Sequence, residues 1–150
     1  MARILIIDDD PEARAAVARR LRRAGYEVEE AAGEHEGVER IRSNPAPFDL
    51  VITDMVMEDP DSGIRTLEAA LARDMFSEVI VLTAYGKIVQ AVECMRRGAF
   101  DYVEKNIPDV DVYELLVLRA GAALDRRLSS LQALRRYQEI GQREGIALVE

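Results

Sequence analysis

The sequence has a single cysteine, Cys94, and no apolar stretch long enough to cross a membrane. One cysteine excludes an intrachain disulfide and a cysteine-based metal site, and a membrane helix needs roughly 20 mainly apolar residues in a row. The N-terminus leads straight into an apolar segment and shows no signal-peptide pattern. We therefore expect a cytoplasmic protein without membrane insertion.

Basic residues are also few, with 20 Lys and Arg against 28 Asp and Glu and a net charge of −8. Because a nucleic-acid groove is normally basic, we expect no direct nucleic-acid binding by this chain. Apolar residues make up 49% of the 150 residues, which is enough for the core of one domain.

An acidic cluster follows the first apolar run, where residues 4–7 (Ile-Leu-Ile-Ile) lead into Asp8, Asp9 and Asp10. The run is typical of a strand buried on both faces. Three neighbouring carboxylates repel one another, and a hard divalent cation is the simplest positive partner. Alternatively, the acids serve the N-terminus of a helix that begins at Pro11.

Strand-like and helix-like patterns then alternate along the chain. This order predicts an α/β fold, a parallel five-stranded sheet with helices on both faces. The predicted strands are residues 4–7, 26–32 (a weak edge strand), 48–53, 79–83 and 100–103. Helices are predicted over residues 11–24 and 33–43, around Ile64, Leu67 and Leu71, and around Ile88, Val89, Val92 and Met95.

Polar residues follow four of these strands: the first acidic cluster, Asp54, Thr83 and Lys105. Ligands of parallel sheets bind at the carboxyl ends of the strands, where these groups converge. A strand-end aspartate can attack phosphorus and form an aspartyl-phosphate, with Mg²⁺ neutralising phosphoryl charge. Taken singly, Asp54 is equally a turn aspartate, Thr83 a strand threonine and Lys105 a solvated lysine.

From about Val110 the pattern becomes one long helix. Its apolar positions continue past the length needed to cover the sheet, at Leu124, Leu128, Leu131 and Leu134, and its other faces carry Arg126, Arg127, Arg135 and Arg136. We expect residues 1–124 to form the domain and residues 125–150 an amphipathic extension or linker. Gly141 and Gly145 predict fraying before the apolar tail at 146–149.

Four segments resemble the receiver domains of two-component response regulators (CheY-like) over about residues 1–124. They are Ile-Leu-Ile-Ile-Asp-Asp-Asp-Pro-Glu-Ala-Arg, Leu-Val-Ile-Thr-Asp-Met-Val-Met, Val-Leu-Thr-Ala-Tyr-Gly and Gly-Ala-Phe-Asp-Tyr-Val-Glu-Lys. The resemblance implies a flavodoxin-like (βα)5 fold, Mg²⁺, and phosphoryl transfer from the phosphohistidine of a sensor histidine kinase or phosphotransfer protein. Such a domain catalyses its own phosphorylation and dephosphorylation without being a conventional turnover enzyme.

The resemblance also assigns roles to single residues. It makes Asp54 the phosphoacceptor and Asp8 and Asp9 the acidic pair. Asp8, Asp9 and Asp54 hold the metal, with Asp9 favoured over Asp8 as the direct ligand. The backbone carbonyl of Val56 is a further metal ligand, and Lys105 binds the phosphoryl group. Thr83 and Tyr102 form the switch pair, and Asp10 serves the start of the helix instead of the site.

Two departures from the family pattern bear on the site. The proline that often follows the phosphoacceptor segment is displaced, so that Met57 leads into Glu58-Asp59-Pro60-Asp61-Ser62-Gly63. The usual lysine-proline pair is Lys105-Asn106, which favours a trans peptide because a non-proline cis bond costs roughly 3 kcal/mol. The residues flanking the path of attacking water, Val56 and Tyr85, are neither acids nor amides, which predicts slow self-dephosphorylation.

Three functions compete at this point. The leading one is a phosphorylation-activated switch that changes its protein contacts, with a possible homodimer through the last helix. A phosphatase of the haloacid dehalogenase kind would need an Asp at the position of Val56, so the sequence argues against it. A degenerate receiver that acts only as a dimerisation or scaffold module remains open because of Asn106. His35 is predicted to be a surface residue.

Overall fold

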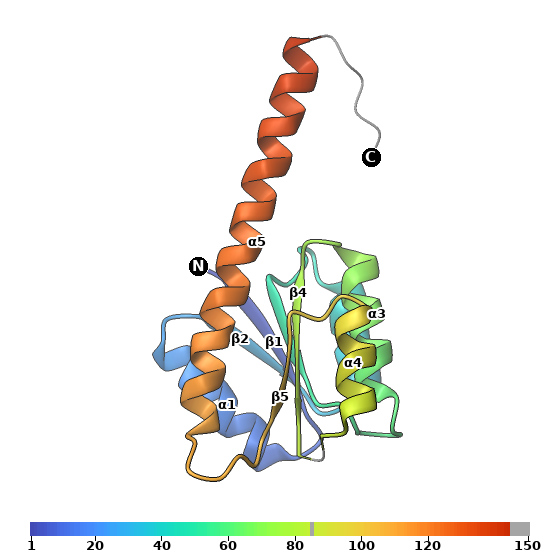
Figure 1. Cartoon of the computed structure of the whole chain (residues 1–150), viewed down its shortest axis with the longest axis vertical. Helices are drawn as coiled ribbons and strands as arrows, with labels where there is room; N and C mark the ends of the chain where they lie inside the picture. Colours follow the sequence, from blue (N-terminus) through green and yellow to red (C-terminus); the bar gives the residue numbers. More distant parts are fainter. Residues whose placement is uncertain (85, 145–150) are drawn as a thin grey trace.

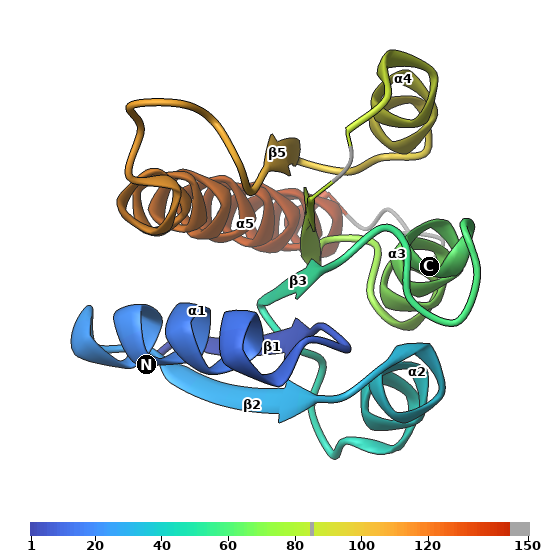
Figure 2. The same ribbon diagram turned by 90° about the horizontal axis from the view of Figure 1, so that it is seen from below.

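A computed structural model describes residues 1–84 and 86–144. Five parallel strands form one sheet in the order β2-β1-β3-β4-β5, and α1 and α5 cover one face while α2, α3 and α4 cover the other (Figures 1 and 2). The predicted parallel fold is therefore confirmed. The strands are β1 Arg3–Ile7, β2 Glu27–Ala31, β3 Leu50–Thr53, β4 Glu78–Thr83 and β5 Asp101–Glu104; the helices are α1 Pro11–Arg23, α2 Glu34–Ser43, α3 Ser62–Arg73, α4 Ile88–Arg96 and α5 Val112–Arg143.

The continuous apolar run of β1 is explained by burial on both faces. Ile4 and Ile6 belong to the core beneath α1 and α5, while Leu5 and Ile7 belong to the core beneath α2, α3 and α4. Successive side chains of a strand point to opposite faces, so a central parallel strand needs apolar residues at every position. β2 is an edge strand with one fully buried residue, Ala31, as its weak pattern predicted.

Most predicted strand and helix boundaries hold to within one residue. The third strand is the exception, because Phe48 and Asp49 precede it and pairing begins at Leu50. Phe48 is nevertheless buried in the core. The Asp49 carboxylate accepts from the Arg3 amide, and the Asp49 amide donates to the Arg3 carbonyl. The apolar side chain of Phe48 therefore led the sequence pattern to predict a strand longer than the paired residues.

The helix predicted from Ile88, Val89, Val92 and Met95 is present as α4, but these four side chains face solvent. Their exposed fractions are 84%, 80%, 50% and 46%, respectively. The only fully buried residue of α4 is Cys94, whose Sγ lies 3.7 Å from Sδ of Met55. The apolar stripe of α4 is thus an exposed surface and not part of the core.

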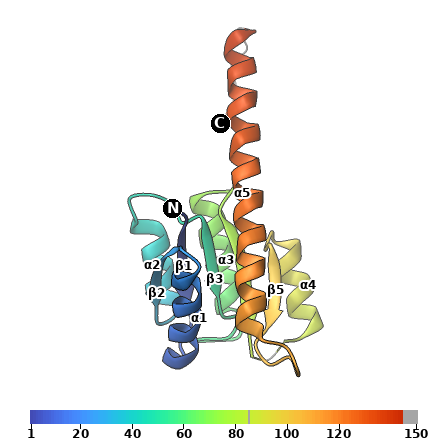
Figure 3. The same ribbon diagram turned by 90° about the vertical axis from the view of Figure 1, so that its left-hand side faces the viewer.

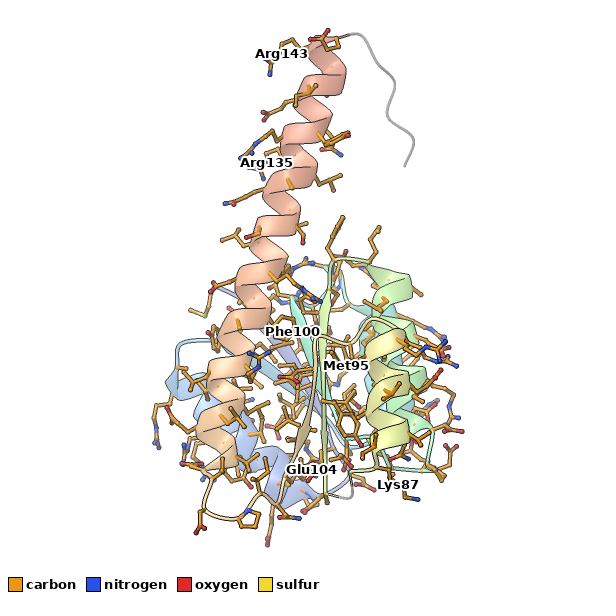
Figure 4. All side chains as sticks on the ribbon, viewed as in Figure 1. Lys87, Met95, Phe100, Glu104, Arg135 and Arg143 are labelled. Atoms are coloured by element: carbon orange, nitrogen blue, oxygen red, sulfur yellow. The ribbon has the colours of Figure 1, made fainter. Side chains whose placement is uncertain are left out.

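α5 runs without interruption through Gly141 to Arg143, so the fraying predicted at Gly141 is absent. Gly145 and the apolar tail lie outside the described residues. Beyond the sheet the helix projects from the body (Figures 1 and 3), and Figure 4 shows Arg135 and Arg143 on this projecting part. None of the described helices is long and apolar enough to cross a membrane.

Two arginines predicted to decorate the outer faces of α5 instead fasten it to the body. Arg127 is buried, and its guanidinium donates to Asp49 Oδ1 at 2.8 Å and to Asp74 Oδ2 at 3.0 Å. Arg126 donates to both carboxylate oxygens of Glu78 and lies over the ring of Phe100. Asp49 precedes β3 and Glu78 begins β4, so these ion pairs join α5 to the amino ends of the strands. They fix the orientation of α5 at the point where it leaves the body.

Candidate functional site

Three carboxylates meet at the carboxyl edge of the sheet. Asp8 follows β1, Asp54 follows β3, and each of Asp8, Asp9 and Asp54 offers an oxygen within 4.8 Å of the others. Asp8 and Asp54 are buried, at 3% and 8% exposure, while Asp9 is exposed to solvent. The structure therefore brings the predicted acidic pair and the predicted phosphoacceptor together.

The backbone holds these residues through extensions of the sheet. The Asp8 amide donates to the carbonyl of Ala31, and the Asp54 amide donates to the carbonyl of Ile7. Asp10 turns away from the cluster and caps α1, accepting from the amides of Glu12 and Ala13. The predicted role of Asp10 at the helix start is confirmed.

Lys105 completes the cluster. Its Nζ lies 2.7 Å from Asp8 Oδ2 and 3.2 Å from Asp54 Oδ2. The Lys105 amide donates to the carbonyl of Thr83 at 2.7 Å, which fixes the start of the loop. No peptide bond among the described residues is cis, so the lysine reaches both carboxylates with the trans peptide that Asn106 predicts.

Charges at the site influence one another strongly. Burial raises the pKa of Asp54, the neighbouring charge of Asp8 adds to this rise, and Lys105 opposes it. Burial by itself would lower the pKa of Lys105, but the hydrogen bond to Asp8 and the charges of Asp54 and Asp8 outweigh it and raise that pKa. Lys105 thus neutralises only part of an acidic site.

Thr83 and Tyr102 lie beside each other on adjacent strands. Thr83 is buried at the end of β4, and Tyr102 in β5 pairs with Val81, two residues earlier. Burial raises the pKa of Tyr102, whereas the backbone of Lys87 and the side chain of Thr83 act in the opposite direction. The two members of the predicted switch pair are therefore neighbours. Tyr85 lies outside the described residues, and His35 is exposed on α2 as predicted.

The loop between β3 and α3 holds contacts that the sequence pattern did not indicate. The carboxylate of Glu58 accepts from the amide of Glu34, at the start of α2. In addition, Arg14 of α1 donates from Nη1 to the Asp8 carbonyl at 2.8 Å. Glu58 and Glu34 are 24 residues apart, and Arg14 is one of several arginines in α1. No local sequence motif therefore predicts either contact.

The donor set suits a hard divalent cation. Carboxylate oxygens of Asp8, Asp9 and Asp54 are grouped, and among the described residues none donates a hydrogen bond to the backbone carbonyl of Val56. Mg²⁺ is typically bound by one or two carboxylates with further oxygen ligands and water. The residues present therefore fit Mg²⁺, with Lys105 as a neighbouring cation able to contact an anionic group.

Comparison with known proteins agrees with this geometry. The family model for the response regulator receiver domain matches residues 4–117. The acid tolerance regulatory protein ActR of Rhizobium meliloti (strain 1021) is 34% identical over 122 residues, covering 81% of this chain and 61% of ActR. The regulatory protein AtoC of Escherichia coli (strain K12) is 35% identical over 118 residues, which cover 79% of this chain and 25% of AtoC. The chain thus spans less than two thirds of the length of these relatives.

Solved structures show the same likeness. A response regulator receiver domain protein from Clostridium thermocellum superposes with a TM-score of 0.74 at 31% identity, over 85% of this chain and 97% of that one. A CheY-like receiver domain protein from Methanospirillum hungatei JF-1 gives 0.75 at 29% identity, over 87% and 98%. With a parallel five-stranded sheet and a family match over most of its length, this chain belongs to the response regulator receiver domain family.

Proposed function

We propose that this chain is a phosphorylation-activated signalling switch acting in the cytoplasm, which accepts a phosphoryl group on Asp54 from the phosphohistidine of a sensor histidine kinase or phosphotransfer protein. The observation that carries the proposal is the position of Lys105 Nζ, between Asp8 Oδ2 and Asp54 Oδ2 in the acidic cluster. An ammonium group held there can form an ion pair with the phosphoryl oxygens when the phosphoryl group is transferred to Asp54.

In the proposed step, a carboxylate oxygen of Asp54 attacks phosphorus. The new O–P bond forms as the N–P bond to the donor histidine breaks, and the imidazole leaves with the electron pair and takes up a proton. Bound Mg²⁺ would supply positive charge to the phosphoryl oxygens, held by Asp8, Asp9, Asp54 and the Val56 carbonyl. Lys105 exchanges its contact with Asp54 for one with the phosphoryl group, Thr83 turns toward that group, and Tyr102 follows inward.

Phosphorylation with a small donor tests the proposal. The parent chain and Asp54→Ala are incubated with Mg²⁺ and acetyl phosphate, and the intact mass is measured. A gain of one phosphoryl group in the parent but not in the variant is expected. Equal labelling of both chains, or of neither, would contradict the assignment of Asp54. The geometry of Lys105 favours this function over a degenerate scaffold, for which no labelling is expected.

The residue two past Asp54 bears on how long the phosphoryl group lasts. Val56 is partly exposed and offers no side-chain group that could orient an attacking water. We therefore predict slow self-dephosphorylation of the purified chain in Mg²⁺, measured as decay of the phosphorylated mass after acetyl phosphate is removed. Loss of the phosphoryl group within seconds would contradict this prediction.

The remainder of the proposal concerns the organisation of the chain. We propose residues 1–124 as the receiver and residues 125–150 as a helical extension through which two copies associate. This rests on the exposed apolar side chains of the projecting helix, which include Leu128, Leu134, Tyr137 and Ile140.

A further inference from the structure

A contact in the β3–α3 loop ties the candidate metal site to a helix that contributes no ligand. The single amide N–H of Glu34 donates a bifurcated hydrogen bond to the Glu58 carboxylate, at 2.8 Å to Oε2 and 3.1 Å to Oε1. α2 begins at Glu34, and the preceding residue, Gly33, supplies no side-chain cap. Free amides at a helix start attract a carboxylate, so Glu58 caps α2 from 24 residues away in sequence.

The space for this cap depends on Gly33. A Cβ atom at Gly33 would lie 2.2 Å from Oε1 of Glu58, well inside van der Waals contact. The backbone of Gly33 is extended, a conformation that any residue adopts. Space and not backbone freedom is therefore what a side chain at this position would remove, and the atom it would displace is the capping carboxylate.

A second set of contacts fastens the same loop to α3. Arg65 donates from Nε and Nη2 to the two carboxylate oxygens of Glu34, both at 2.7 Å, and it also pairs with Asp59. Glu34 therefore gives its amide to Glu58 and its side chain to Arg65. The start of α2, the loop and the first turns of α3 form one connected network.

The network lies next to the predicted metal ligand on the loop. On one side of Val56, the Met55 amide donates to Asp54 Oδ1 at 2.7 Å, and the Met55 carbonyl accepts from Gly63 at 2.8 Å. On the other side, Glu58 is held by α2. Val56 is thus in a short segment anchored at both ends. At the outer end, Met57 packs against the core and donates from its amide to the Asp59 carbonyl, and Glu58 adds the contact with α2.

We infer that Glu58 is a positioning residue for the divalent cation: by capping α2 it holds the β3–α3 loop so that the Val56 carbonyl is presented to the ion. The inference rests on the proposed function. It predicts that the cap between the Glu58 carboxylate and the Glu34 amide contributes to the affinity for Mg²⁺, whereas the rate of phosphorylation at saturating Mg²⁺ depends on Asp54 and Lys105.

A calorimetric titration of the unphosphorylated chain with Mg²⁺ gives the dissociation constant and tests the inference. Removing the anchor frees the loop, and each immobilised group costs ordering free energy on binding. We expect Glu58→Ala to raise the dissociation constant several-fold, up to about tenfold, with Glu58→Gln between it and the parent because an amide keeps one acceptor oxygen. Asp61→Asn is the matched control: it removes one charge from the same loop, but the Asp61 carboxylate has no hydrogen bond in the described structure.

A double-mutant cycle makes the test specific to the contact. Gly33→Ala should weaken Mg²⁺ binding, but less than Glu58→Ala does, because a Cβ atom would displace Oε1 of Glu58 while Oε2 lies 3.7 Å away. In the Glu58→Ala background, Gly33→Ala should have little further effect, since no carboxylate remains to be expelled. Additive effects of the two substitutions would overturn the inference.

Further outcomes separate this inference from the proposed function. If Glu58→Ala and Gly33→Ala lower the melting temperature but leave the Mg²⁺ dissociation constant unchanged, Glu58 is a structural cap and the inference is wrong, while the function stands. The inference is also wrong if Glu58→Ala lowers the phosphorylation rate at saturating Mg²⁺. If the parent binds no Mg²⁺, both proposals fail together.

Discussion

At the scale of single residues, the site is a small set of charged side chains that differ in their exposure to solvent. Asp8 and Asp54 are buried, Asp9 is exposed, and Lys105 is half-buried between them. Burying a carboxylate without full compensation is costly, and the raised pKa of Asp54 expresses this cost. The charged form of Asp54 is therefore held at the expense of stability, and a bound cation would offset part of this cost.

This cost predicts a pH-dependent effect of Asp54→Asn in the absence of Mg²⁺. The pKa of Asp54 is raised above its ordinary value of 3.8, so the folded chain holds the proton more tightly than the unfolded chain. The stability contributed by the neutral form is complete below pH 3.8 and is lost as the pH rises through the raised pKa. Because asparagine stays neutral, the variant should melt higher than the parent at pH 7.

The expected difference in melting temperature between the parent and Asp54→Asn is a few degrees. About 1 kcal/mol shifts the melting temperature of a domain of this size by about 2–4 °C, and a shift of that order is expected at pH 7. Thermal melts should converge as the pH falls below the raised pKa. An equal difference between parent and variant at every pH would contradict the burial argument. Asp61→Asn, at an exposed site, serves as the control.

At the scale of elements, α5 is held by specific ion pairs as well as by apolar packing. Its inner face includes the buried Leu116, Ala120 and Ala123, and the next turn brings Arg127 to Asp49 and Asp74. A buried cation is tolerated only with partners of this kind. The pairs join α5 to the residue before β3 and to the end of α3, so they fix the helix against the sheet.

Arg127→Ala should therefore destabilise the fold more than a surface substitution does. Removal of one partner of a buried pair typically costs about 3–5 kcal/mol, because the remaining charges are left unpaired; we expect about 3 kcal/mol, since Asp49 keeps the hydrogen bond from the Arg3 amide. Equilibrium urea unfolding measures the effect. Arg135→Ala, at an exposed position on the same helix, should change the unfolding free energy by less than about 0.5 kcal/mol. Equal effects of the two substitutions would show that the pairs contribute little.

At the scale of the whole molecule, the site and the projecting helix lie at opposite ends. Glu104, the last residue of β5, lies at the carboxyl end of the sheet, whereas Arg135 lies on the part of α5 beyond the opposite end (Figure 4). Exposed apolar side chains occur on α4 and on α5. Any signal that passes from Asp54 to the extension must therefore pass along the body of the domain.

The proposed association through α5 leads to a further prediction. The double substitution Leu128→Glu and Leu134→Glu should give a monomer under conditions where the parent dimerises, because charges in an apolar helix contact are costly. Sedimentation with and without acetyl phosphate and Mg²⁺ gives the oligomeric state. Ser129→Glu, at an exposed position about 100° around the helix from Leu128 and about 140° from Leu134, should leave the dimer intact. A parent chain that is monomeric in both conditions would rule out the dimer.

Local sequence patterns were sufficient to predict the α/β architecture and the residues that follow each strand. An apolar run such as residues 4–7 predicts a buried strand, and in a parallel sheet the next residue must lie at the carboxyl edge. For this reason the positions of Asp8, Asp54 and Lys105 at one edge could be expected from the order of the elements. The family resemblance added roles that no spacing could supply.

The pairing of charged groups and the covering of helix faces depend instead on tertiary structure. The exposed stripe of α4, the buried Arg127 and the cap that Glu58 gives to α2 all involve neighbours distant in the chain. An apolar stripe shows that a helix has one apolar face, but not that another element covers it. Likewise, an arginine or glutamate has the same local signature whether it is solvated or bound, because its partner is chosen by the packing of the whole molecule.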